Sequence, residues 1–169
     1  MSFIRSSGEK DDRSRPFPWL CANCHTRSIV PAVIDYTAKV KHDGVVHELH
    51  LRDLEVPRCQ NCDETVITTV ADERINDALR THLRLLTPAQ IRKGIEKLEL
   101  EQQQMAEQLG VAPETISRWV NGALIQSRAM DNLLRLFFES EEVRKLLQRR
   151  FEPALLNDFA SVTEVQGVS

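Results

Sequence analysis

The chain has 169 residues, of which 41% are hydrophobic and 28% are charged, and its formal net charge is −3 at pH 7. This size and balance suit one or two small soluble domains. No apolar stretch is long enough to span a membrane, and the N-terminal sequence MSFIRSSGEKDDRSRPFPW lacks the apolar run of a secretory signal. We therefore expect a cytoplasmic protein without a membrane anchor. The acidic balance does not exclude nucleic acid, because many small DNA-binding domains use a local basic face.

The first part of the chain predicts a short lead-in followed by a small β domain. Residues 1–18 are polar and charged and contain proline, which favours a disordered lead-in. Residues 19–70 contain runs of β-forming residues, and a turn at His42, Asp43 and Gly44 separates two of these runs. The β-forming residues are Val33, Ile34, Tyr36, Val40, Val45, Val46, Leu49 and Leu51. Together they predict a small antiparallel sheet.

Four cysteines lie at the two ends of this β region, as Cys21-x2-Cys24 and Cys59-x2-Cys62. In a reducing cytoplasm such cysteines are metal ligands or free thiols more often than disulfides. Two CxxC pairs can place four thiolates tetrahedrally around Zn²⁺, and a site closed by four cysteines has no position for water or substrate. We predict one structural zinc ion, whose binding supplies the stability that so small a sheet lacks. Iron, a dithiol redox pair and four unrelated thiols are the alternatives.

Other chemistry-bearing residues give weaker signals. His25 follows Cys24 directly, but four cysteines already complete the ligand set. His47 and His50 form an HxxH pattern, yet residues three apart on a strand point to opposite faces, so we expect two sheet residues. No Ser/His/Asp set, glycine-rich phosphate loop or buried carboxylate pair is recognisable. We therefore predict that the protein is not an enzyme; a zinc-dependent or redox enzyme would need an open metal position or a reactive thiol.

The second half of the chain has helical periodicity. A connecting helix is predicted within residues 71–86, where Ile75, Leu79, Leu83 and Leu86 recur at helical spacing. Residues 87–151 then predict a domain of five helices, and residues 152–169 a flexible tail. The expected helix caps are Thr87, which forms a capping box with Gln90, and Ser127 and Ser140. The predicted fold class is α+β with two domains, a zinc-bound antiparallel β module followed by an all-α domain.

Residues 101–122, EQQQMAEQLGVAPETISRWVNG, predict two short helices joined by a tight turn at Gly110. The apolar positions fall where two crossed helices bury them, at Met105, Ala106, Leu109, Val111, Ile116 and Val120. This pattern is typical of a DNA-reading helix-turn-helix. Residues 113–120 are the expected recognition helix, ended by Asn121 and Gly122, and its first turn would enter the major groove. Trp119 lies beside Ile116 on the helical wheel, so we expect it in the core.

Five residues of this segment are candidate DNA contacts. Arg118 has the reach to donate two hydrogen bonds to guanine O6 and N7. Thr115 and Ser117 can reach phosphates or a thymine methyl group, and Gln102 lies at a helix N-terminus that suits a phosphate. Glu114 would repel phosphates, and is useful in the groove where it accepts from a donor such as cytosine N4. For each residue the alternative is a solvated position on the helix surface. Further candidates for phosphate contact are Arg92 and Arg128.

The segment LELEQQQMAEQLGVAPETISRWVNG resembles the XRE (Cro/repressor) helix-turn-helix. Together with the N-terminal CxxC pairs and the following GALIQSRAMDNLLRLF, it resembles the MqsA (YgiT-type) antitoxin family over about residues 19–150. In that family the zinc module binds a cognate ribonuclease toxin, and the helical module dimerises and represses the toxin–antitoxin operon at a palindrome. The resemblance implies roles for particular residues: zinc ligands at Cys21, Cys24, Cys59 and Cys62, base-facing positions at Glu114 and Arg118, and positions near the DNA backbone at Ser117 and Gln102.

Three positions depart from the family pattern. Glu101 stands where Ser or Thr usually caps the second helix, Ala112 is a poor cap for the third, and Glu114 replaces a neutral amide. We expect an antitoxin-like autorepressor that binds double-stranded DNA as a homodimer and binds a toxin through its zinc domain. The alternative is a stand-alone zinc-containing XRE-type regulator without a toxin partner.

Overall fold

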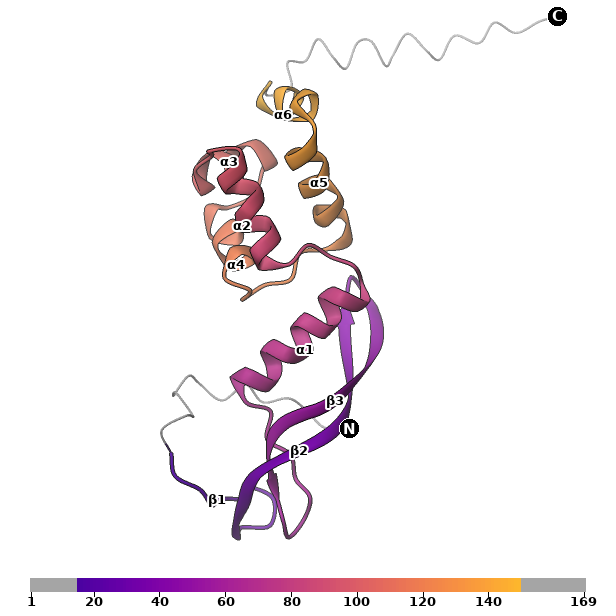
Figure 1. Cartoon of the computed structure of the whole chain (residues 1–169), viewed down its shortest axis with the longest axis vertical. Helices are drawn as coiled ribbons and strands as arrows, with labels where there is room; N and C mark the ends of the chain where they lie inside the picture. The colour runs from indigo at the N-terminus through magenta and orange to yellow at the C-terminus, as the bar shows by residue number, and fades with distance from the viewer. Residues whose placement is uncertain (1–14, 150–169) are drawn as a thin grey trace, which may run out of the picture. The chain divides into compact units, whose positions relative to one another are not determined.

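The computed structural model describes residues 15–149, and the chain divides into two compact units between Arg84 and Leu85. Three strands and a helix come first, and five helices follow (Figure 1). This order confirms the predicted α+β class. The lead-in up to residue 14 and the tail expected from residue 152 lie outside the described residues. Within residues 15–149, no helix is both long enough and apolar enough to cross a membrane.

The first unit is built on a long antiparallel hairpin. Strand β2 (Arg27–His42) pairs with β3 (Val45–Cys59), and the short β1 (Trp19–Leu20) pairs with the other edge of β2. The hairpin turns at Asp43 and Gly44, whose φ angles are 48° and 81°. Two positive φ angles are what a two-residue turn of type I′ requires, and Asp-Gly supplies them at low strain. The predicted sheet and its turn are both confirmed.

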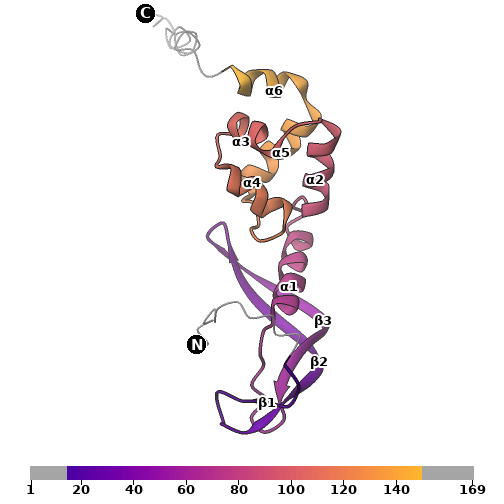
Figure 2. The same cartoon turned by 90° about the vertical axis from the view of Figure 1, so that its left-hand side faces the viewer.

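Helix α1 (Thr69–His82) packs against β3 (Figure 2). It buries Ala71, Ile75 and Leu79, and the sheet buries Ala38, Leu49, Leu51, Leu54 and Val56. The predicted boundaries of this helix were wrong by a few residues at each end. It starts earlier because the Thr68 side chain accepts a hydrogen bond from the Ala71 N–H. It ends at His82, and Arg84 follows with a φ of 52°.

The structured part of the first unit begins slightly before the predicted residue 19. The ring of Phe17 stacks on Trp19 with centroids 4.4 Å apart. The Trp19 Nε1–H donates to the Arg15 carbonyl at 3.0 Å. Arg15 and Phe17, predicted as part of the lead-in, therefore contact Trp19 of β1.

The second unit contains the five predicted helices. These are α2 (Pro88–Lys97), α3 (Gln102–Leu109), α4 (Pro113–Val120), α5 (Arg128–Glu139) and α6 (Glu141–Gln148). Helices α2 to α5 share one apolar core, and α6 packs the partly buried Leu147 against it. The buried members of the core are Ile91, Ile95, Met105, Ala106, Leu109, Ile116, Trp119, Val120, Leu134 and Phe137. Each predicted cap is present: the capping box at Thr87, and hydroxyls that accept from backbone N–H groups at Ser127 and Ser140.

A buried polar network, which the sequence did not reveal, supports the start of α5. The Asp131 side chain is fully buried and its Oδ1 accepts from the Leu86 N–H at 2.7 Å and from Gln126 Nε2 at 3.0 Å. Its Oδ2 accepts from Arg135 Nε at 2.8 Å. Burial alone would raise the pKa of this carboxyl, but the hydrogen bonds from Leu86, Arg135 and Gln126 lower it below its usual range. The carboxylate is therefore ionised and held at its acceptor sites.

Candidate metal centre and nucleic-acid interface

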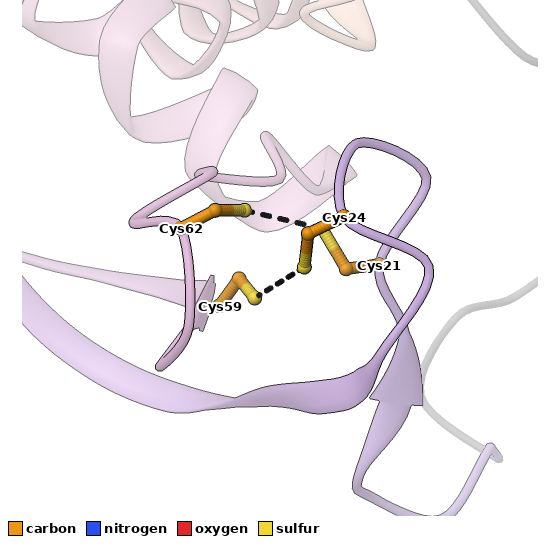
Figure 3. A group of neighbouring side chains, drawn as sticks. All are labelled: Cys21, Cys24, Cys59 and Cys62. Carbon is orange, nitrogen blue, oxygen red and sulfur yellow. Dashed lines mark hydrogen bonds between the residues drawn. The ribbon is translucent and has the colours of Figure 1, made fainter.

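The two CxxC segments fold into turns with the same hydrogen-bond pattern. In the first, the N–H of His25 donates to the Cys21 carbonyl at 3.0 Å, and the Cys21 N–H donates to Thr26 at 2.8 Å. In the second, Asp63 and Glu64 take the places of His25 and Thr26, with distances of 3.0 and 2.8 Å. His25 and Asp63 both have positive φ angles, 58° and 62°. Each turn thereby presents its two sulfurs on one side (Figure 3).

The sheet brings the two turns together. Ile29, just after the first turn, is the register partner of Cys59, and the Gln60 N–H donates to the Ser28 carbonyl at 2.9 Å. As a result the four Sγ atoms lie within 4.8 Å of one another. Two of the contacts cross between the turns, at 3.6 Å for Cys21 to Cys62 and 3.6 Å for Cys24 to Cys59 (Figure 3).

This arrangement fits a tetrahedral metal ion. With Zn–S bonds of about 2.3 Å, the sulfurs of a tetrahedral site lie about 3.8 Å apart. All four cysteines are free thiols, and Cys21 and Cys59 are fully buried beside Trp19 and Ile29. Four thiolates are soft ligands that favour zinc or iron. The predicted ligands Cys21, Cys24, Cys59 and Cys62 therefore form a possible metal site.

The electrostatics of the cluster also suit a cation. The pKa of Cys24 is lowered to about 5, first because the Thr26 hydroxyl lies 3.0 Å from its sulfur and then because the Asn61 side chain donates to it. The Glu64 backbone N–H lowers the pKa of Cys62, but burial and the neighbouring thiols outweigh it and raise this pKa to about 11. A bound divalent metal keeps its thiol ligands deprotonated, and would therefore offset the raised pKa of Cys62.

The histidines lie outside this cluster. Among the described residues, the group with metal-binding geometry contains the four cysteines and no histidine. His50 is exposed on β3, where its Nδ1 lies 3.1 Å from Thr37 Oγ1. His47 is half-buried, with its ring edge-on to His82 at a centroid distance of 5.6 Å. The two histidines of the HxxH pattern thus have different neighbours, Thr37 for His50 and His82 for His47.

In the second unit, α3 and α4 are joined at Gly110 as predicted. Gly110 has a φ of 70° and ends α3, and the Val111 N–H donates to the Ala106 carbonyl at 3.0 Å. After α4 the chain turns at Gly122, whose φ is 78°. Trp119 is buried in the core, as expected. The two helices thus have the short, glycine-turned connection of a helix-turn-helix.

The caps of these two helices differ from the usual pattern in the way the sequence indicated. At the start of α3, the Gln104 side chain accepts from the Glu101 N–H at 3.2 Å, a contact that the spacing E-x-x-Q would have predicted. At the start of α4, Ala112 provides no side-chain cap. Pro113 in the first helical position lowers the number of uncapped N–H groups there, because proline has none.

The predicted DNA contacts lie on accessible parts of α3 and α4. Gln102, Glu114 and Arg118 are exposed, and Thr115 and Ser117 are half-buried. The Ser117 hydroxyl accepts a long hydrogen bond, 3.4 Å, from the Asn121 side chain. All five side chains are therefore at least partly exposed to solvent.

Two further candidates have intramolecular partners. The Arg92 guanidinium donates to the Val120 carbonyl at 3.0 Å, at the C-terminal end of α4. Arg128 lies 3.7 Å from the buried Asp131 carboxylate. The Arg92 contact therefore joins α2 to the end of α4, whereas the Arg128 contact lies within α5. The sequence alone showed neither contact.

Comparison with known proteins identifies the type of domain in the second unit. No curated protein matches the chain. A family model described as helix-turn-helix matches residues 90–142, which contain α3, the Gly110 turn and α4. Families of this kind bind DNA and are typically not enzymatic. Residues 90–142 are therefore an XRE-type DNA-binding helix-turn-helix domain, preceded in the chain by a four-cysteine cluster on a β-sheet.

Proposed function

We propose that the protein is a dimeric, sequence-specific transcriptional repressor that binds a palindromic operator through α4. The observation that carries this proposal is the α3–Gly110–α4 arrangement, which buries Ile116 and Trp119 and leaves Glu114 and Arg118 exposed on the recognition helix. In helix-turn-helix proteins the N-terminal residues of the recognition helix contact base edges. Arg118 then contacts a guanine, Thr115 and Ser117 contact phosphates or a thymine methyl group, and Gln102 contacts the backbone.

We further propose that the protein is an antitoxin whose first unit binds a cognate ribonuclease toxin. This proposal rests on the occurrence of a CxxC pair module and an XRE-type helix-turn-helix in one chain. The four cysteines would hold one zinc ion that stabilises the β module, and a site closed by four protein ligands offers no position for catalysis. A stand-alone regulator differs in lacking the toxin, and keeps the same DNA interface.

Gel-shift assays on the promoter DNA upstream of the gene test the DNA-binding proposal. A two-fold dimer should bind an inverted repeat whose half-sites are about 34 Å apart, one turn of B-DNA. Arg118→Ala should relax the preference at one base pair per half-site, whereas Gln102→Ala should weaken binding to all sequences alike. Equal losses on every sequence for both variants would contradict this division of roles.

Co-purification with the product of the neighbouring gene tests the antitoxin proposal. A stable complex with a small ribonuclease, together with promoter binding, would support it. Promoter binding with no ribonuclease partner would instead support a stand-alone regulator. The two proposals therefore fail separately, because the gel shift does not depend on the toxin.

A further inference from the structure

The recognition helix α4 carries a glutamate and an arginine that do not form an ion pair with each other. Glu114 and Arg118 are four residues apart on α4, so they lie one turn apart on the same face. Both are exposed, and within residues 15–149 neither side chain makes an ion pair or side-chain hydrogen bond. Equivalent pairs elsewhere in the same unit are closed, with Lys145 to Glu141 at 2.6 Å and Arg135 to Asp131 at 2.8 Å. The free ends of Glu114 and Arg118 are therefore available to a ligand.

A carboxylate at this position has few partners in DNA. It accepts hydrogen bonds and does not donate them, so it is repelled by phosphates, by guanine O6 and N7, and by thymine O4. Cytosine N4 offers a donor in the major groove without an acceptor on the same base edge, whereas adenine places its N7 acceptor beside the N6 donor. Cytosine is therefore the base that Glu114 fits best.

The charges of the second unit increase the effect of Glu114 on DNA affinity. Between residues 85 and 149 the basic and acidic side chains are equal in number, and several of the basic ones have partners inside the unit. Among these are Arg92, Arg135, Arg144 and Lys145. Because these residues carry no excess of positive charge, one carboxylate in the groove weakens binding to arbitrary DNA appreciably.

We propose that Glu114 is a specificity-determining residue that reads a cytosine in each operator half-site and disfavours binding to other DNA. This inference rests on the proposed DNA-binding function. Four helical residues rise about 6 Å, and successive base pairs are about 3.4 Å apart. The cytosine read by Glu114 therefore lies within about two base pairs of the guanine read by Arg118. A residue of this kind lowers total affinity and raises discrimination, because it adds a repulsive element against wrong sequences.

Selection from random DNA, with the wild-type protein and with Glu114→Gln, tests this inference. The wild type should select a cytosine at one position of the half-site, with a preference of about 5- to 150-fold, the range of one good base contact. Glu114→Gln should lose that preference or shift it to adenine, because an amide pairs with adenine N6 and N7. The other selected positions, including the guanine, should not change.

A second measurement concerns DNA without an operator. Glu114→Gln should bind it more tightly than the wild type, by about two- to fivefold, as expected from removing one exposed charge near phosphates. Glu139→Gln is the matched control, since it removes an exposed carboxylate at the end of α5 and should leave the selected sequence unchanged.

Two outcomes would overturn the inference. If Glu114→Gln selects the same bases as the wild type, Glu114 reads no base. If it weakens binding to every sequence equally, Glu114 instead orients Arg118 or caps α4. A wild-type protein that selects no sequence at all would be a failure of the proposed function, and the selection experiment separates that result from the other two.

Discussion

Replacing Asp131 by alanine should destabilise the helix-turn-helix unit strongly. The substitution removes the acceptor of the Leu86 N–H at 2.7 Å and of Gln126 Nε2 at 3.0 Å, while Gln126 still donates to the Leu86 carbonyl at 2.8 Å. Removing one partner from a buried charged network costs about 3 to 5 kcal/mol. Alanine recovers up to about 0.7 kcal/mol through its helix propensity. We therefore expect the free energy of unfolding of this unit to fall by about 3 kcal/mol.

Each unit contains one of the two tryptophans, so the loss can be measured in the intact protein. In a Trp19→Phe background, the buried Trp119 is the fluorescent reporter of the second unit. Urea unfolding followed at this residue gives the free energy directly. For a unit of this size, a loss of 3 kcal/mol lowers Tm by more than about 10 °C. The matched control is Asn132→Ala, which changes an exposed neighbour on α5.

The pH dependence gives an independent check. Because the folded-state pKa of Asp131 is lowered, its stabilising contribution is present above the unfolded pKa, about 3.9, and is lost as the pH falls through the folded value. Asp131→Asn keeps one acceptor oxygen and removes the charge, so its deficit relative to the wild type should be constant above about pH 5 and shrink in more acidic solution. A loss below 1 kcal/mol for Asp131→Ala, or a deficit in Asp131→Asn that does not change with pH, would refute this reasoning.

Three further substitutions test other parts of the chain. A Cβ on Gly94 would lie 2.8 Å from the Phe138 ring. Gly94→Ala should therefore lower the stability of the second unit by about 1 kcal/mol, although alanine gains about 1 kcal/mol in helix propensity. Adding Phe138→Leu should restore the stability, because it removes the ring from the contact. Gly110→Ala should lower the stability of the same unit by about 1 kcal/mol, because an alanine with a φ of 70° is strained. No atom lies within 4 Å of the new Cβ, so no clash adds to this cost. A larger fall in Tm would contradict this account. Cys59→Ser should abolish stoichiometric zinc binding, measured by metal analysis, and unfold the first unit, while gel shifts on operator DNA persist; loss of DNA binding as well would show that the units are not independent.

Local signals in the sequence determined much of this protein. Turns and helix caps depend on residues within a few positions of one another, so they can be predicted from the sequence. This holds for the Asp43-Gly44 turn, the caps at Thr87, Ser127 and Ser140, and the left-handed Gly110. The CxxC spacing likewise predicted the cysteine cluster, because each pair forms its own turn and needs the sheet only to meet the other pair.

The tertiary structure decided the features that join distant residues. Asp131 accepts a hydrogen bond from the Leu86 N–H, 45 residues away in the sequence, and Arg92 donates to the Val120 carbonyl, 28 residues away. No periodic pattern in the sequence predicts either contact. The same holds for the end of α1 at His82, since Leu85 is buried in the second unit and does not continue the helix. A side chain's partner depends on which groups packing brings within about 3 Å, and the order of residues along the chain does not contain that distance.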